Sequence, residues 1–278
     1  MIRFLVPINF ASYSINALNY CATLANHFNG EITLLYCYTH LLSENQDNSN
    51  QRIISSLQDA TTELDKLKAQ ITKEFKNNIS VKTHIIDGYP EDTIQTFSNE
   101  YHPDLIVMGT KNKGETIKEL LGTVTLDIIK NGSFPVLAVP NNYQVNIQQL
   151  TNILFITDFK KCEYTSLHKL VRLVGAFNTK IHNVQHCPSG KEKEDVELLN
   201  EYDEYCKTTY RNQNMICDYI CGNDIIAASK DYIENNQISL MAITRKKRSV
   251  IAKMLQPSIT KKLLFNSEIP TLFFHQPS

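Results

Sequence analysis

The sequence lacks any run of about 20 apolar residues, the length that a helix needs to cross a bilayer, so no membrane span is expected. It also lacks a charge excess, because 28 basic and 29 acidic residues leave a formal net charge of -1. A dedicated nucleic-acid binder or an acidic tail is therefore not expected. The first residues have no signal-peptide architecture and pass directly into a strand pattern, which favours a cytoplasmic protein.

Cysteine pairs with C-x-x-C spacing are also absent, and the seven cysteines are an odd number. Several fall in apolar helix or strand patterns, as reduced thiols in a protein core do. Cys217 and Cys221 are four apart on an expected strand, but they have no obvious partners for a zinc site. His182 and His186, also four apart, are expected to be ordinary strand-end histidines. No Ser-His-Asp order, Cys-His pair or paired-carboxylate pattern can be assigned, so we expect no enzyme.

The chain does contain an internal repeat. A shift of 149 positions places Phe4–Phe10 on Ile153–Phe159, and a shift of 135 places Leu105–Leu137 on Leu240–Leu272. Two copies of one unit explain both matches. At aligned positions the first copy keeps glycines that the second copy has lost.

The two copies predict two domains, at residues 1–142 and 150–278, each of about 140 residues or slightly fewer. The stretch Pro140–Asn146 is the candidate linker. Because the shift falls from 149 to 135, the first copy is about 14 residues longer in its middle. The polar stretch Ser43–Asn50 is the natural place for this excess, and a helix is expected to follow at about Ile53–Phe75.

Short apolar runs alternate with amphipathic helical patterns in each copy. Phe4–Ile8 and Leu105–Val107 are continuous apolar runs, as in strands that are buried on both faces of a parallel sheet. Strands that alternate with helices form right-handed β-α-β units with helices on both faces of the sheet. The sequence therefore predicts an α/β fold with two tandem Rossmann-like domains, each containing a five-stranded parallel sheet.

A segment with two well-placed glycines follows the strand Leu105–Met108. Gly109, at the carboxyl end of this strand, lets the backbone approach a ligand without a Cβ clash. Gly122 and Thr123 open a helix whose free N–H groups and positive dipole end favour a phosphate, and the hydroxyl of Thr125 is a further donor. Ligands of open α/β sheets bind outside the carboxyl ends of the strands, where this segment lies. The alternative is that these glycines serve only tight turns and close helix–strand packing.

This pattern resembles the universal stress protein (UspA) family in its tandem two-domain form. Nucleotide-binding members carry G-x2-G-x9-G-[ST] after the fourth strand. Here the spacing is intact, and the four defined positions hold Gly109, Asn112, Gly122 and Thr123. There are two departures, because Asn112 replaces a glycine and Asn9 stands where those members have an aspartate. The resemblance covers nearly the whole chain and implies adenine nucleotide alpha hydrolase-like domains with the strand order 3-2-1-4-5.

The resemblance also implies a ligand, ATP with Mg²⁺, in the first copy. By residue matching, adenine is expected near the ends of the first two strands, at Pro7, Ile8, Asn9 and Cys37. The phosphates are expected near the turn after the fourth strand and the helix start that follows it. This second group comprises Gly109, Asn112, Gly122, Thr123, Val124 and Thr125 near the phosphates, and also Met108, at the strand end, which is expected to bind the ligand without assignment to one part of it.

In the second copy the motif is degraded. Asp158 keeps the acid that the first copy lost, but Thr244 and Lys247 stand in the places of the first two motif residues. Pro257 replaces the glycine before the helix. We therefore expect that this copy does not bind ATP in the family manner. The basic run Arg245–Arg248 is either a solvated loop or a site for an anionic partner.

Three functions remain open. The first is a cytoplasmic stress-response protein that binds ATP or a related nucleotide in the first copy without efficient catalysis, its bound state being read by partner proteins. The second is a non-nucleotide interaction scaffold in which both sites are degenerate. The third, a transferase or hydrolase, is disfavoured because no nucleophile can be assigned. The chain is expected to be a monomer whose copies pair internally, or a homodimer, with no nucleic-acid or membrane partner.

Overall fold

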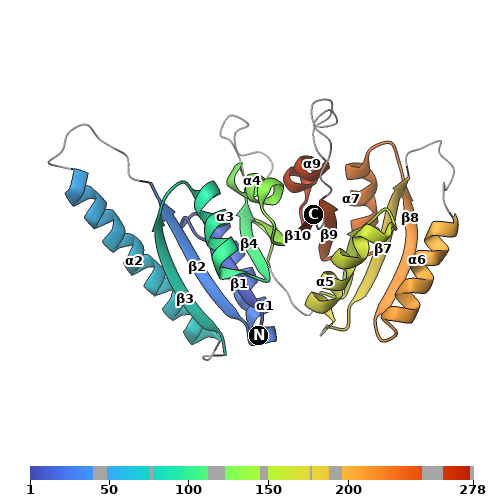
Figure 1. Ribbon diagram of the computed structural model, residues 1–278, viewed down its shortest axis with the longest axis horizontal. Helices are drawn as coiled ribbons and strands as arrows, with labels where there is room; N and C mark the ends of the chain where they lie inside the picture. Colours follow the sequence, from blue (N-terminus) through green and yellow to red (C-terminus); the bar gives the residue numbers. More distant parts are fainter. Residues whose placement is uncertain are drawn as a thin grey trace. The chain divides into compact units, whose positions relative to one another are not determined.

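The computed structural model describes residues 1–39, 49–75, 78–111, 123–144, 150–175, 177–187, 196–245 and 259–275. The chain forms two compact units, Met1–Val145 and Asn146–Ser278 (Figure 1). Within the described ranges, no helix is both long enough and apolar enough to cross a membrane.

The first unit is a parallel sheet with the strand order β3-β2-β1-β4-β5. Right-handed crossovers in this order place α1 and α2 on one face and α3 and α4 on the other (Figure 1). The elements in chain order are β1 (Arg3–Pro7), α1 (Ser12–Phe28), β2 (Glu31–Tyr38), α2 (Ser49–Glu74), β3 (Ser80–Asp87), α3 (Pro90–Tyr101), β4 (Leu105–Thr110), α4 (Thr123–Asn131) and β5 (Val136–Pro140).

The core of the first unit lies around the two central strands. In β1, the side chains of Phe4, Leu5 and Val6 are fully buried, and every residue of β4 is buried. Helices on both faces exclude water from both sides of these strands, so apolar residues are favoured at consecutive positions rather than at alternate ones. The continuous apolar runs of the sequence have this origin.

The second unit repeats this architecture with the strand order β8-β7-β6-β9-β10, all parallel. The predicted α/β fold and the order 3-2-1-4-5 are thus confirmed for both units. The elements in chain order are β6 (Asn152–Ile156), the short 3₁₀ helix η2 (Lys161–Glu163), α5 (Tyr164–Val174), β7 (Lys180–Cys187), α6 (Val196–Thr209), β8 (Asn214–Cys221), α7 (Ile225–Asn235), β9 (Leu240–Arg245), α9 (Ile259–Asn266) and β10 (Thr271–His275).

The duplication extends to unusual backbone conformations. Phe10 and Phe159, which the shift of 149 aligns, both follow the first strand with left-handed backbone, at φ 61° and 60°. His102 and Gln237, aligned by the shift of 135, have φ 52° and 51°. Because non-glycine residues rarely adopt this conformation, its recurrence at aligned positions indicates common descent of the two units.

The extra length of the first unit lies mainly in a helix, where the sequence placed it in a loop. Helix α2 has 26 residues and its counterpart α6 has 14. Of the stretch expected to be a loop, Ser49 and Asn50 belong to α2, and the rest lies outside the described residues. For these two residues the loop prediction was wrong, because polar residues are typical both of loops and of helix ends.

Candidate functional site

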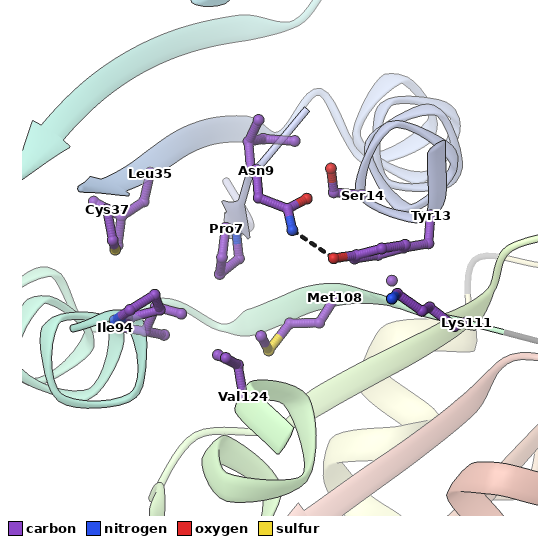
Figure 2. A pocket seen from close by; sticks show the side chains of 13 residues that line it. Pro7, Asn9, Tyr13, Ser14, Leu35, Cys37, Ile94, Met108, Lys111 and Val124 are labelled. Carbon is purple, nitrogen blue, oxygen red and sulfur yellow. Dashed lines mark hydrogen bonds between the residues drawn. The ribbon is translucent and has the colours of Figure 1, made fainter. Parts of the chain in front are cut away.

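A pocket of about 200 Å³ lies at the carboxyl end of the first unit's sheet, where the strand order reverses between β1 and β4 (Figure 2). Open α/β sheets bind their ligands at such a switch point, because the chain leaves the two strands in opposite directions and opens a crevice. The residues that line it are Pro7, Ile8, Asn9, Tyr13, Ser14, Leu35, Cys37, Pro90, Ile94, Met108, Gly109, Lys111 and Val124.

Most of the residues expected from the sequence meet in this pocket. Its lining includes all four expected near adenine, and from the second group Met108, Gly109 and Val124. Thr125 is buried behind it, and its hydroxyl donates to the carbonyl of Gly109 at 3.3 Å. Thr123 begins α4, as expected from the motif. The motif residues Asn112 and Gly122 lie outside the described residues.

Six lining residues were missed from the sequence, although the positions of three of them carried a usable indication. Leu35 lies two residues before Cys37 and so faces the same side of β2. Lys111 directly follows β4, and Tyr13 lies in the first turn after β1, at the same end of the sheet. The others are Ser14, Pro90 and Ile94.

Asn9 is held within its own loop. Its Oδ1 accepts from the backbone N–H of Ala11 at 3.2 Å, and its side-chain amide donates to the hydroxyl of Tyr13 (Figure 2). The first bond closes a local turn that a side-chain oxygen at this position favours. Asn9 therefore does more than replace an aspartate, because it also fixes the phenol ring of Tyr13 at the pocket.

Gly109 is required for helix packing, which was the alternative explanation of the glycines. A Cβ at this position would lie 2.0 Å from the carbonyl oxygen of Tyr13 and 2.4 Å from its carbonyl carbon. No backbone atoms tolerate such distances, so α1 approaches β4 only because residue 109 has no side chain. The reason given from the sequence, close approach to a ligand, is not what the geometry at this Cα shows.

The described lining residues carry one cationic side chain and no carboxylate. The ammonium group of Lys111 lies 5.9 Å from the centroid of the Tyr13 ring. Burial, and then the negative charge of Glu91, raises the pKa of Cys37 to about 11, so its thiol stays protonated at neutral pH. The described lining thus combines a cationic side chain with a protonated thiol.

Comparison with known proteins agrees with this geometry. The model of the universal stress protein family matches residues 1–140. The chain belongs to the universal stress protein family. A universal stress protein of Methanocaldococcus jannaschii, MJ0531, is 27% identical over 139 residues, which are 49% of this chain and 81% of that protein.

Solved structures of the family show the same fold for both units. A universal stress protein from Archaeoglobus fulgidus matches with a TM-score of 0.77 at 16% identity, over 99% of this chain and 98% of the other. A protein from Pseudomonas aeruginosa matches with a TM-score of 0.60 at 16% identity, over 98% of this chain and 92% of the other. The predicted tandem form of the universal stress protein fold is thereby confirmed.

In the second unit, residues aligned with the pocket lining are hydrogen-bonded to one another. Glu163, which the shift of 149 aligns with Ser14, is only 2% exposed. Its carboxylate accepts from the hydroxyl of Thr157 and, at 2.9 Å, from the backbone N–H of Asp158. Tyr202 is fully buried, and its ring centroid lies 4.9 Å from the ring centroid of Phe159. The end of β6 therefore already has an anion bound to its amide.

Other second-unit residues expected from the sequence have structural partners. Asp158 accepts from the backbone N–H of Lys160, whose ammonium group lies 3.7 Å from the same carboxylate. Thr244 is buried in β9. Of the basic run, Arg245 ends β9 and the others lie outside the described residues.

The two histidines of β7 also have structural partners. His182 is buried, with Nδ1 2.9 Å from the hydroxyl of Tyr232. His186 Nε2 lies 2.9 Å from the carbonyl oxygen of Gly222. Among the described side chains, no group of three or more His, Cys, Asp and Glu is arranged to hold a metal ion.

His182 predicts a loss of stability in acid. Burial, and then the charge of Lys180, lowers its pKa to about 4, against the opposing effect of Asp218. The unfolded chain, with a histidine pKa of about 6.5, binds a proton that the folded unit excludes. The contribution of His182 to stability is therefore complete above pH ~6.5, and up to about 3 kcal/mol is lost as the pH falls through 4.

Urea unfolding at several pH values between 7 and 4 tests this expectation. The His182→Gln variant should lose less stability than the wild type across this range, because its side chain does not titrate. Parallel curves for the two proteins would contradict the assignment.

Proposed function

We propose that this universal stress protein binds ATP or a related nucleotide in the first unit and does not turn it over efficiently. The observation that supports this proposal is the pocket at the switch point, which collects seven of the eleven binding residues expected from the family resemblance. Cys21 and Cys206 are buried, as reduced thiols in a protein core are, which fits the expected cytoplasmic location.

The two ends of the pocket differ in chemistry as a nucleotide requires. Leu35, Ile94 and Met108 give one part an apolar wall that suits a base. Lys111 supplies positive charge for phosphate, and the first turn of α4, where Val124 lies, supplies the backbone N–H groups of a helix N-terminus. Magnesium would arrive with the nucleotide, since the described lining residues include no carboxylate to hold it.

The same lining accounts for the lack of efficient catalysis in the proposal. Hydrolysis of a nucleotide needs a group that positions or deprotonates the attacking water. The described lining residues include neither histidine nor carboxylate, and the thiol of Cys37 is protonated. Any turnover is expected to be slow. Partner proteins would therefore recognise the nucleotide-bound form of the protein itself.

Val124 provides a direct test. A Val124→Asp variant places a carboxylate in the first turn of α4, where it stabilises the helix but repels a phosphate. We expect its affinity for ATP, measured by titration calorimetry, to fall at least about tenfold. Val124→Asn, similar in size but neutral, is the matched control and should lose much less.

A thermal scan gives the complementary result. Saturating ATP should stabilise the wild type, by about 2.7 kcal/mol at 100 times the dissociation constant, because it binds only the folded protein. If millimolar ATP neither stabilises the protein nor gives heat on titration, the scaffold function replaces this proposal. The buried carboxylate of Glu163, which already accepts from the backbone after β6, is the observation that favours the scaffold.

A further inference from the structure

The orientation of the Asn9 amide is fixed by chemistry. The backbone N–H of Ala11 is only a donor, so the Asn9 atom that lies 3.2 Å from it must be the oxygen. The amide nitrogen therefore faces Tyr13 and donates to its hydroxyl oxygen. In this bond Tyr13 is the acceptor.

This direction leaves the hydrogen of the Tyr13 hydroxyl available for another acceptor. A phenol carries one donor hydrogen in addition to its acceptor oxygen, and Asn9 uses only the oxygen. An aspartate at position 9 would reverse the bond, because a carboxylate can only accept and would take this hydrogen. The change from acid to amide thus converts Tyr13 into a donor toward the pocket.

The surroundings of Tyr13 define what it can meet there. Figure 2 shows its ring extending from α1 toward Asn9, with Lys111 on the other side of the ring. Cys37 and Ile94 lie at the opposite, apolar part of the pocket. A hydroxyl donor and an ammonium group at one end, with no carboxylate among the described lining residues, suit an anionic oxygen.

We infer that Tyr13 determines the specificity of this pocket by donating its hydroxyl hydrogen to a phosphate oxygen of the ligand. The inference rests on the proposed function and narrows it. The ligand is a nucleotide whose first phosphate is read by Tyr13, and the corresponding nucleoside binds more weakly. Because Lys111 supplies the charge, recognition of this phosphate does not depend on a divalent cation.

Titration calorimetry of the full chain with AMP and with adenosine, without Mg²⁺, tests this. The wild type should bind AMP at least about tenfold more tightly than adenosine. Tyr13→Phe, which removes only the hydroxyl, should lower this ratio of affinities about tenfold or more. Asn9→Asp should lower it as well, because the carboxylate takes the hydrogen and repels phosphate. Tyr89→Phe is the control, since Tyr89 is 65% exposed and outside the lining, and it should keep the wild-type ratio.

The outcomes separate the two proposals. A wild-type preference for AMP that survives in Tyr13→Phe overturns the role of Tyr13 and leaves nucleotide binding intact. An equal loss of affinity for both ligands also overturns it, because that pattern reports damage to the pocket rather than a lost phosphate contact. Binding of neither ligand by the wild type overturns the inference, and the proposed function is overturned with it if ATP does not bind either. Thermal melts of the variants confirm that they are folded.

Discussion

Replacing Gly109 with alanine is expected to destabilise the first unit by at least about 3 kcal/mol. The added Cβ would lie 2.0 Å from a carbonyl oxygen of α1, and backbone on both sides of the contact cannot move aside as a flexible side chain would. Relief requires α1 to shift away from β4, which opens the core. Hydrogen exchange should show the loss directly, as faster exchange of the amides of β1 and β4.

The aligned position in the second unit provides the control. Thr244 is buried in β9, and among the described residues its hydroxyl has no hydrogen-bond partner. Thr244→Ala should therefore change stability by less than about 1 kcal/mol. A similar loss of stability in the two alanine variants would show that the close approach of α1 is not the reason why residue 109 must be glycine.

Removing the carboxylate of Glu163 is expected to cost the second unit about 3 kcal/mol. Glu163→Ala leaves the buried hydroxyl of Thr157 and the backbone N–H of Asp158 without their acceptor, and it leaves an empty space beside them. Urea unfolding measures the loss, and hydrogen exchange assigns it to β6 and the turn that follows it.

The Glu163→Gln variant distinguishes the effect of the negative charge from the effect of side-chain volume. The amide keeps one acceptor oxygen and nearly the same volume, so its cost should be clearly smaller than that of alanine. If Glu163→Ala unfolds at the same urea concentration as the wild type, the carboxylate does not hold the end of β6 in place, and another explanation for its burial is needed.

Gly109 and Glu163 illustrate how the two units of this universal stress protein have diverged. The first unit keeps Gly109, a close-packed α1 and an open pocket. In the second unit a short 3₁₀ helix, Lys161–Glu163, precedes α5, which begins at Tyr164. Because the helix begins later, Glu163 can turn its carboxylate to the strand end. The proposed division of labour, in which only the first unit binds nucleotide, follows from this difference.

The position of the candidate site was predictable because it depends on the backbone. The carboxyl ends of β1, β2 and β4 follow from the order of apolar runs, and the family resemblance named residues at these strand ends, such as Pro7 and Met108. Tyr13 and Glu163 could not. Each is a polar residue near the start of a helix, a position at which most side chains face water. The sequence does not indicate that these two side chains point toward the end of a strand.

By itself, the sequence determined the duplication, the α/β fold with its strand order and the end of the sheet at which a ligand would bind. The duplication follows from residue matches at fixed shifts, the α/β fold from periodicity along the chain, and the strand order from the family resemblance. The tertiary structure decided why residue 109 is glycine, which partner Asn9 has and which groups the buried carboxylate of Glu163 binds. These depend on how closely a helix lies on a strand that is distant in sequence, and packing alone sets that distance.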